Sequence, residues 1–133
     1  MIENYNFEIL EDTIKIYFCN VSFKNDIMGY LIPILYNSNF FNVSQDNTEL
    51  SLFVSSKVDL SLLSFLNCDN EEYNIIKINQ NYHQINDVGV VSEISKFFSS
   101  INIPILYVNS FNNNYILIPN KHIDKIENHF IHY

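Results

Sequence analysis

The chain has 133 residues, of which 47% are hydrophobic, and carries a formal net charge of −8 at pH 7. An acidic surface repels phosphate backbones, which argues against nucleic-acid binding. No uninterrupted apolar run reaches about 18 residues, and the first residues lack the pattern of a signal peptide, so we expect a soluble cytoplasmic protein with no membrane contact. The length fits one medium domain or two very small ones packed on each other.

The first forty residues predict two strands and a helix. Residues 7–10 and 14–20 alternate as strands do, and Glu11-Asp12 between them fits a hairpin turn. Pro33 lies within the helical pattern and lacks an N–H, so a kinked helix and a helix that starts near Leu31 fit equally well. The apolar face of this helix consists of Ile27, Tyr30, Leu31, Ile34 and Leu35.

The next stretch predicts three strands and a short helix. Residues 40–45 and 49–55 look like paired strands, and residues 73–79 like a further strand. Residues 58–66 fit a short helix between them. Its expected inward-facing residues are Leu62, Leu63 and Leu66.

The second half largely repeats this order. An amphipathic helix is expected within residues 86–102, with Asn86 or Asp87 as its N-cap. Strands follow at 103–110 and 114–119, and a helix covers residues 121–130. The apolar stripe of the first of these helices consists of Val90, Val91, Ile94, Phe97, Phe98 and Ile101.

Strand, helix, strand, strand, helix, strand is the order of a ferredoxin-like βαββαβ unit. We therefore expect an α+β fold of two such units, residues 1–72 and residues 73–133, each an antiparallel sheet with helices on one face. Cys19 and Cys68 have no metal-ligand spacing, and we expect both to be buried thiols.

The segment from Gly89 to Phe130 carries a family resemblance. It reads Gly-Val, an amphipathic helix, the strands of INIPILYVNSFNNNYILIP and a short helix. This segment resembles the second ACT domain of the cytosolic arginine sensors of the CASTOR type, and the ACT tandems of aspartate kinases. The first half resembles the first ACT domain of those sensors through its initial strands, its proline-containing helix and FFNVSQDNTELSLFVSS.

The resemblance implies a regulatory protein that binds a small molecule, usually an amino acid, where two ACT units meet. The loop before the helix would offer N–H groups to a carboxylate, a glycine would let the chain approach the ligand, and a strand of the partner unit would face them. It also implies a homodimer, since the full sensors have four units, and a regulatory protein partner. The implied ligand-binding residues are Asn86, Asp87, Val88, Gly89, Val90, Pro104, Ile105, Ser110, Phe111 and Asn114.

Some residues depart from the arginine-binding relatives. Those place carboxylates near the positions of Asn86 and Asn114, and a serine at the position of Pro104. Neutral amides bind a guanidinium less strongly than carboxylates do, so the identity of the ligand stays open. The alternative is a dimerisation module that has lost ligand binding. No nucleophile–base set, carboxylate pair or phosphate loop is evident. We therefore expect no enzyme, no catalytic residue, no cofactor and no metal site.

Overall fold

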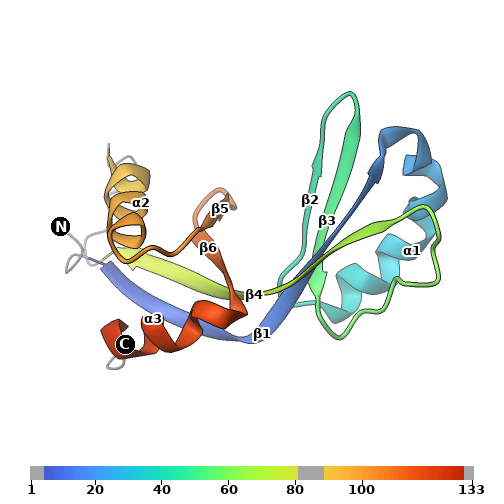
Figure 1. Ribbon diagram of the computed structural model, residues 1–133. Helices are drawn as coiled ribbons and strands as arrows, with labels where there is room; N and C mark the ends of the chain where they lie inside the picture. The colour runs from blue at the N-terminus through green and yellow to red at the C-terminus, as the bar shows by residue number, and fades with distance from the viewer. Residues whose placement is uncertain (1–4, 81–88, 131–133) are drawn as a thin grey trace. The chain divides into compact units, whose positions relative to one another are not determined.

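The computed structural model describes residues 5–80 and 89–130 (Figure 1). The elements follow in the order β1 (Tyr5–Asn20), η2 (Val21–Phe23), α1 (Lys24–Asn37), β2 (Asn42–Gln45), β3 (Glu49–Ser55), β4 (Asn67–Gln80), α2 (Val90–Ser100), β5 (Leu106–Asn109), β6 (Asn114–Pro119), η3 (Asn120–His122) and α3 (Ile123–Phe130). Helices combined with antiparallel strand pairs confirm the expected α+β class. Within these ranges the longest helix has 14 residues, and no described helix could span a bilayer, which takes about 20.

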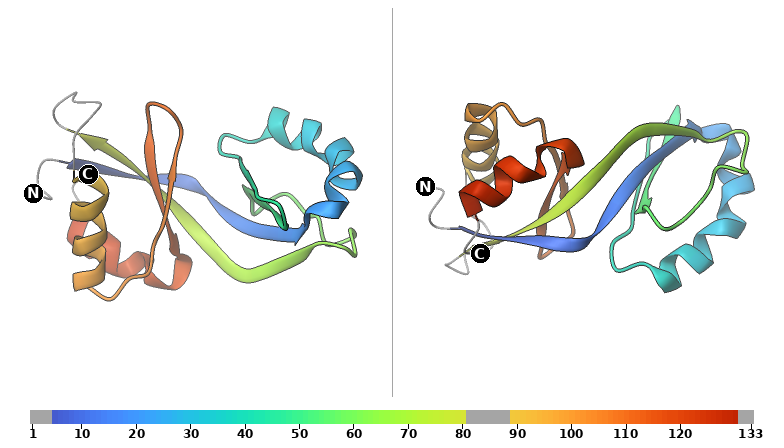
Figure 2. Two further views of the ribbon diagram at one scale, coloured as in Figure 1. Left: turned by 90° about the horizontal axis from the view of Figure 1, so that it is seen from above. Right: turned by 60° about the horizontal axis from the view of Figure 1, so that its bottom comes forward.

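The strands are hydrogen-bonded in the order β2-β3-β1-β4-β6-β5. The long strands β1 and β4 run in opposite directions, as their arrows show in Figure 1 and Figure 2. Contacts divide the chain into two compact units. We call Asp12–Glu72 the middle unit, and residues up to Glu11 together with those from Tyr73 onward the terminal unit.

Both units use one strand order. In the middle unit, β1 lies between β3 and β4, with β2 at the edge; in the terminal unit, β4 lies between β1 and β6, with β5 at the edge. The expected division at 72/73 coincides with a change of unit along the chain, but residues 5–11 group with the second part rather than the first. The reason is that β1 is continuous and supplies its first half to the terminal unit.

The hairpin expected around Glu11-Asp12 is wrong, because residues 5–20 form one strand. A two-residue hairpin turn requires positive φ at a central position. Among the described residues, Gly89 and Asn102 have positive φ, and both lie elsewhere. Glu11 and Asp12 therefore continue the strand.

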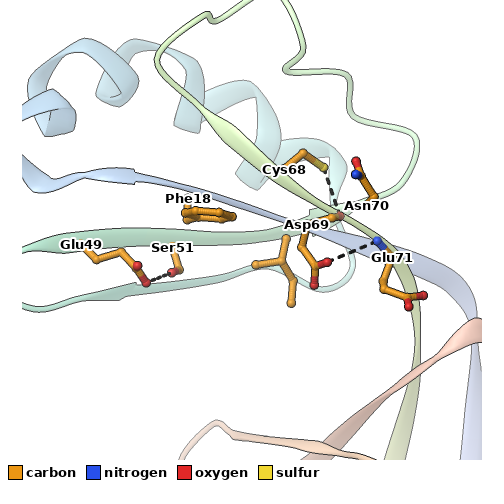
Figure 3. Close-up of a pocket in the computed structure, with 8 residues that line it drawn as sticks. Phe18, Glu49, Ser51, Cys68, Asp69, Asn70 and Glu71 are labelled. Atoms are coloured by element: carbon orange, nitrogen blue, oxygen red, sulfur yellow. Dashed lines mark hydrogen bonds between the residues drawn. The ribbon is translucent and has the colours of Figure 1, made fainter.

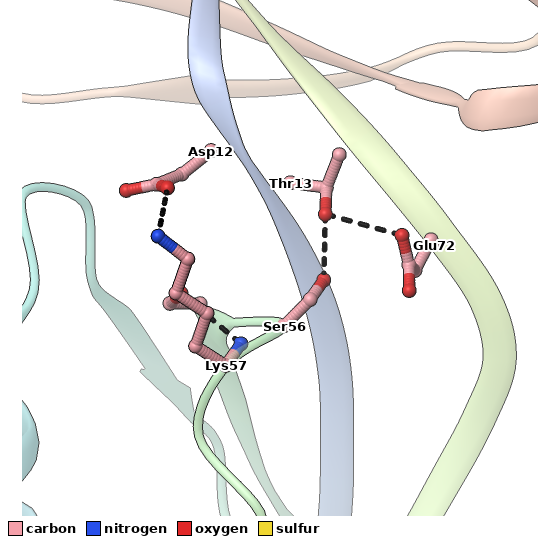
Figure 4. A network of polar contacts seen from close by, with 6 residues as sticks. Asp12, Thr13, Ser56, Lys57 and Glu72 are labelled. Carbon is pink, nitrogen blue, oxygen red and sulfur yellow. Dashed lines mark hydrogen bonds and ion pairs between the residues drawn. The ribbon is translucent and has the colours of Figure 1, made fainter.

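Polar contacts hold this part of β1 within the middle unit (Figure 4). The Thr13 Oγ1 atom lies 2.8 Å from Ser56 Oγ and 3.1 Å from Glu72 Oε2. A hydroxyl has one proton and an ionised carboxylate only accepts, so Thr13 donates to Glu72 and accepts from Ser56. Lys57 Nζ also lies 3.4 Å from the Asp12 carboxylate.

Helix α1 covers one face of the middle sheet and continues through Pro33. Asn37 Nδ2 donates to the Pro33 carbonyl over 2.9 Å, which satisfies one acceptor in the last turn. Tyr30 and Leu35, expected on the inner face, are exposed instead. The buried cluster beneath the helix consists of Tyr17, Cys19, Ile27, Ile34, Leu50, Leu52, Val54 and Leu60.

The helix expected at 58–66 is wrong, because these residues form successive turns. The Leu63 N–H donates to the Leu60 carbonyl, and the Leu66 N–H to the Leu63 carbonyl. Asp59 accepts from the Ser61 N–H over 2.9 Å, a local bond that competes with helix formation. The segment still contributes Leu60 to the core, whereas Leu62, expected to face inward, is 95% exposed.

The terminal unit has two helices packed on its sheet. Helix α2 buries Val90, Ile94 and Phe98, whereas Val91, expected on the same stripe, is half-exposed. The Tyr5 hydroxyl donates to Glu93 over 2.8 Å and ties β1 to α2. The buried cluster consists of Tyr5, Phe7, Ile76, Ile78, Val90, Ile94, Phe98, Ile103, Ile116, Ile118 and Ile126.

Helix α2 ends in a Schellman motif. Asn102 has φ +58, and its N–H donates to the Ser99 carbonyl over 3.0 Å. The next N–H, of Ile103, donates to the Phe98 carbonyl over 3.0 Å, and both of these side chains are buried. This pattern terminates the helix and turns the chain toward β5.

Candidate functional site

The N-terminus of α2 is formed by a glycine in the left-handed region. Gly89 is the N-cap residue, with φ +92 and ψ 0. A Cβ built at this position would meet no atom of the described residues within 4 Å, so no described part of the chain encloses the backbone there. Gly89 has no side chain to accept from the first-turn N–H groups. Those groups and the helix dipole suit an anionic ligand group such as a carboxylate.

Of the other residues expected in the preceding loop, Asn86, Asp87 and Val88 lie outside the described residues. Val90, also expected in the site, is buried and packs into the core beneath α2. Its side chain therefore anchors the helix, and its main chain is the part available at the helix N-terminus.

Pro104 and Ile105 lie beyond the other end of α2. The helix has 11 residues, about 16 Å at 1.5 Å per residue, and it separates Gly89 from Pro104. One unit therefore does not bring these two positions into one ligand site.

Ser110, Phe111 and Asn114 lie together in the hairpin between β5 and β6. Asn109 pairs with Asn114, and the Ser110 N–H donates to the Asn113 carbonyl over 3.0 Å. Phe111 at the tip is almost fully exposed. The structure thus places these residues on one exposed hairpin at the sheet edge formed by β5.

An open hollow of about 690 Å³ lies on the middle unit, a feature that we did not predict (Figure 3). Tyr17, Cys19, Leu50 and Leu52 point into the core beneath α1, and their strand neighbours line this opposite face. The lining residues are Ile16, Phe18, Glu49, Ser51, Cys68, Asp69, Asn70 and Glu71.

Acidic and polar groups surround the hollow. Ser51 donates to Glu49 over 3.1 Å, and the Glu71 N–H donates to Asp69 over 3.4 Å (Figure 3). Three of the eight lining residues carry carboxylates and none is basic, so the surface attracts cations. The sequence signal was the acidic run of residues 68–72. Its place on a strand became evident only because β4 begins at Asn67, six residues before the expected start.

The two cysteines differ in exposure. Cys19 is buried as expected, and burial, reinforced by the charge of Glu49, raises the pKa of its thiol. Cys68 is exposed at the rim of the hollow, so the expectation of a buried thiol is wrong there. Its Sγ donates to the Asp69 carbonyl over 3.3 Å.

Comparison with protein families gives a match in the second half of the chain. Residues 70–128 match the sequence model of the ACT domain. This range contains α2, β5 and β6, and therefore Gly89 and the β5–β6 hairpin. A comparison with curated proteins finds no match.

Solved structures share the fold over nearly the whole chain. A protein from Agobacterium tumefaciens is 16% identical, with a TM-score of 0.71, over 94% of this chain and 85% of that one. A structure of aspartokinase α and β subunits is 15% identical, with a TM-score of 0.66, over 96% and 95% of the two chains. An aspartate kinase from Clostridium acetobutylicum is 12% identical, with a TM-score of 0.66, but this chain spans only 32% of that enzyme. At these identities the likeness concerns the fold.

Proposed function

We propose that this protein is a regulatory module that binds an amino acid at the N-terminus of α2. The β5 edge of the terminal unit of a second copy completes the site. The observation that carries the proposal is the left-handed, open Gly89 at the start of a helix within the segment that matches the ACT domain. The structural likeness to aspartokinase chains, one of which is described as an allosteric enzyme, supports a regulatory role.

Under this proposal, each part of the site has its own role. The first-turn N–H groups of α2 bind the ligand carboxylate, because the helix dipole is positive there. Gly89 allows that approach, since no Cβ projects toward the ligand. The β5 strand, at the edge of its sheet, offers main-chain groups to the ligand ammonium group and to the second unit. Ligand binding then favours one packing of two units over another, and this change in packing alters the binding of a protein partner.

A thermal-shift screen of the common L-amino acids at millimolar concentration tests the proposal. We expect at least one to raise the melting temperature, because a ligand at a hundred times its Kd stabilises the native state by about 2.7 kcal/mol. The hit is then titrated by calorimetry against two variants. Gly89→Asp places a carboxylate beside that of the ligand and should abolish binding. Gly89→Asn has the same shape without the charge, and it should retain part of the affinity.

This pair of variants separates lost binding from lost folding. Aspartate at a helix N-cap stabilises the helix, so Gly89→Asp should unfold no more easily than Gly89→Asn. If no amino acid stabilises the wild-type chain, or if Gly89→Asp binds the hit as tightly as wild type, the proposed site is wrong.

The second candidate function is assembly without a ligand. It is favoured by the outer surface of α1, which exposes apolar side chains that the rest of the middle unit does not cover. Under this alternative, no amino acid alters the melting temperature, and the oligomeric state is unchanged in Gly89→Asp.

A further inference from the structure

Helix α1 is apolar on the side that faces away from its own unit. We define its outer face as Met28, Ile32, Leu35 and Tyr36, which are 49%, 61%, 55% and 85% exposed. These residues follow the i, i+4, i+7, i+8 spacing of one helix face, whereas Ile27 and Ile34 point into the core. A surface helix normally carries polar residues on its outer side, so this face has the composition of an interface.

A recess lies in the same face. Gly29 is next to Met28 and about one turn before Ile32, and a Cβ built on it would meet no atom of the described residues within 4 Å. Its helical φ does not require glycine, and a mid-helix glycine costs about 1 kcal/mol relative to alanine. No packing within the described chain explains this glycine. A second helix that approaches closely would, because the absence of a side chain lets the two backbones come together.

We propose that the outer face of α1 binds the same face of a second copy of this chain, with the two helices antiparallel. With the twofold axis at Ile32, Tyr36 is about 6 Å along the helix from the axis, level with Met28 of the other copy and close to its Gly29. The large aromatic side chain of each copy then covers the recess of the other. The contact is self-complementary, as a twofold interface requires.

Area and charge both favour a second copy as the occupant. If pairing covers these four side chains completely on both copies, it buries up to about 1,000 Å², the lower limit for a specific interface. Residues 27–37 contain no charged side chain, so no like charges meet in the contact, although each chain carries a net charge of −8. Repulsion between the copies is therefore long-range, and raising the salt concentration should strengthen dimerisation.

Sedimentation velocity on the full chain, at micromolar to hundred-micromolar concentration, tests the proposal. We expect a concentration-dependent dimer that tightens between low and high salt. Ile32→Lys brings two ammonium groups together at the axis and should weaken dimerisation at least a hundredfold. Leu62→Lys is the matched control, because Leu62 is an exposed leucine on the same unit outside this face, and it should dimerise as wild type.

A second variant keeps the result independent of folding. Gly29→Leu improves helix propensity, so the monomer should melt at the same temperature or higher, yet the filled recess should weaken dimerisation at least tenfold. In a Cys68→Ser background, Ile32→Cys should form an intermolecular disulfide under mild oxidation, because the two positions meet at the axis. A monomer at all concentrations, or a dimer unaffected by Ile32→Lys and Gly29→Leu, would overturn the proposal. The second result would move the interface elsewhere, for example to the β5 edge.

Discussion

The middle and terminal units share a strand order but cover their sheets differently. The terminal unit has two helices, α2 and α3, over its apolar cluster. The middle unit has one α-helix, and the irregular segment 56–66 follows β3 where a second α-helix would complete the pattern, with leucines packed on the buried cluster. The comparison shows that an irregular segment can pack on a ferredoxin-like sheet in place of a helix, provided that its leucines are buried in the core.

The difference also appears in the helices themselves. Helix α2 has buried apolar residues on one side and mostly polar residues on the other, as a helix that belongs to one core should. Helix α1 is apolar on both sides and leaves its outer face exposed. The terminal unit is therefore the better candidate for a ligand site formed by the backbone, and the middle unit for an assembly surface.

The largest effect should come from the irregular segment of the middle unit. Leu60 is buried in the core beneath α1 and Leu62 is exposed, two residues away in the same segment. Leu60→Ala should lower the free energy of unfolding by about 2–5 kcal/mol, because it leaves a cavity. Leu62→Ala should change it by no more than about 0.5 kcal/mol. Urea denaturation measures both, and a larger loss for Leu62→Ala than for Leu60→Ala would mean that residues 58–66 form the helix that their sequence suggests.

A smaller effect should come from the end of α2. Asn102 has a left-handed φ, which costs a β-branched residue about 1–2 kcal/mol, so Asn102→Val should destabilise the chain by that amount. Asn102→Gly should be neutral or slightly stabilising, since glycine adopts this conformation freely. The same urea titration checks the pair. An equally stable Asn102→Val variant would show that the terminal unit does not depend on this motif.

The smallest effect concerns the free energy of unfolding at acid pH. Asp46, in the turn between β2 and β3, accepts from the N–H groups of Thr48 and Glu49 over 2.8 and 2.7 Å, and from the Thr48 hydroxyl. These bonds lower the pKa of its carboxyl below the ordinary value of 3.8. Because the folded pKa is the lower one, the stabilisation is present above pH 3.8 and is lost as the pH falls through the folded value.

Asp46→Ala removes this contribution. Its free energy of unfolding should therefore change less than that of wild type between pH 5 and pH 2, as urea titrations at several pH values would measure. Parallel pH profiles for the two proteins would contradict the assigned role of the turn.

Local sequence patterns predicted much of this fold. The strands at 42–45 and 49–55, helix α2 and the strands at 106–109 and 114–119 were all expected, because their apolar periods match their elements. The helix predicted at residues 58–66 was wrong because leucines three apart fit both a helix and successive turns. The hydrogen bond from the Ser61 N–H to Asp59 favours the turns. The placement of residues 5–11 in the terminal unit depends on long-range pairing, which no local period encodes.

The candidate site was predictable where one residue type carries the information. Gly89 was singled out as one of two glycines, and its positive φ explains why that position requires glycine. The separation of Gly89 from Pro104 by the length of α2 is a property of the folded chain, as is the acidic hollow, whose residues come from three strands.

Amide NMR of the full chain tests the proposed function most directly, because its two glycines give two distinguishable backbone signals. On titration with the amino acid that stabilises the protein most, the Gly89 signal and its neighbours in the first turn of α2 should shift. The Gly29 signal and those of Ser51, Asp69 and Glu71 in the hollow should stay in place. Shifts confined to the hollow, or no shift with any amino acid at millimolar concentration, would contradict the account.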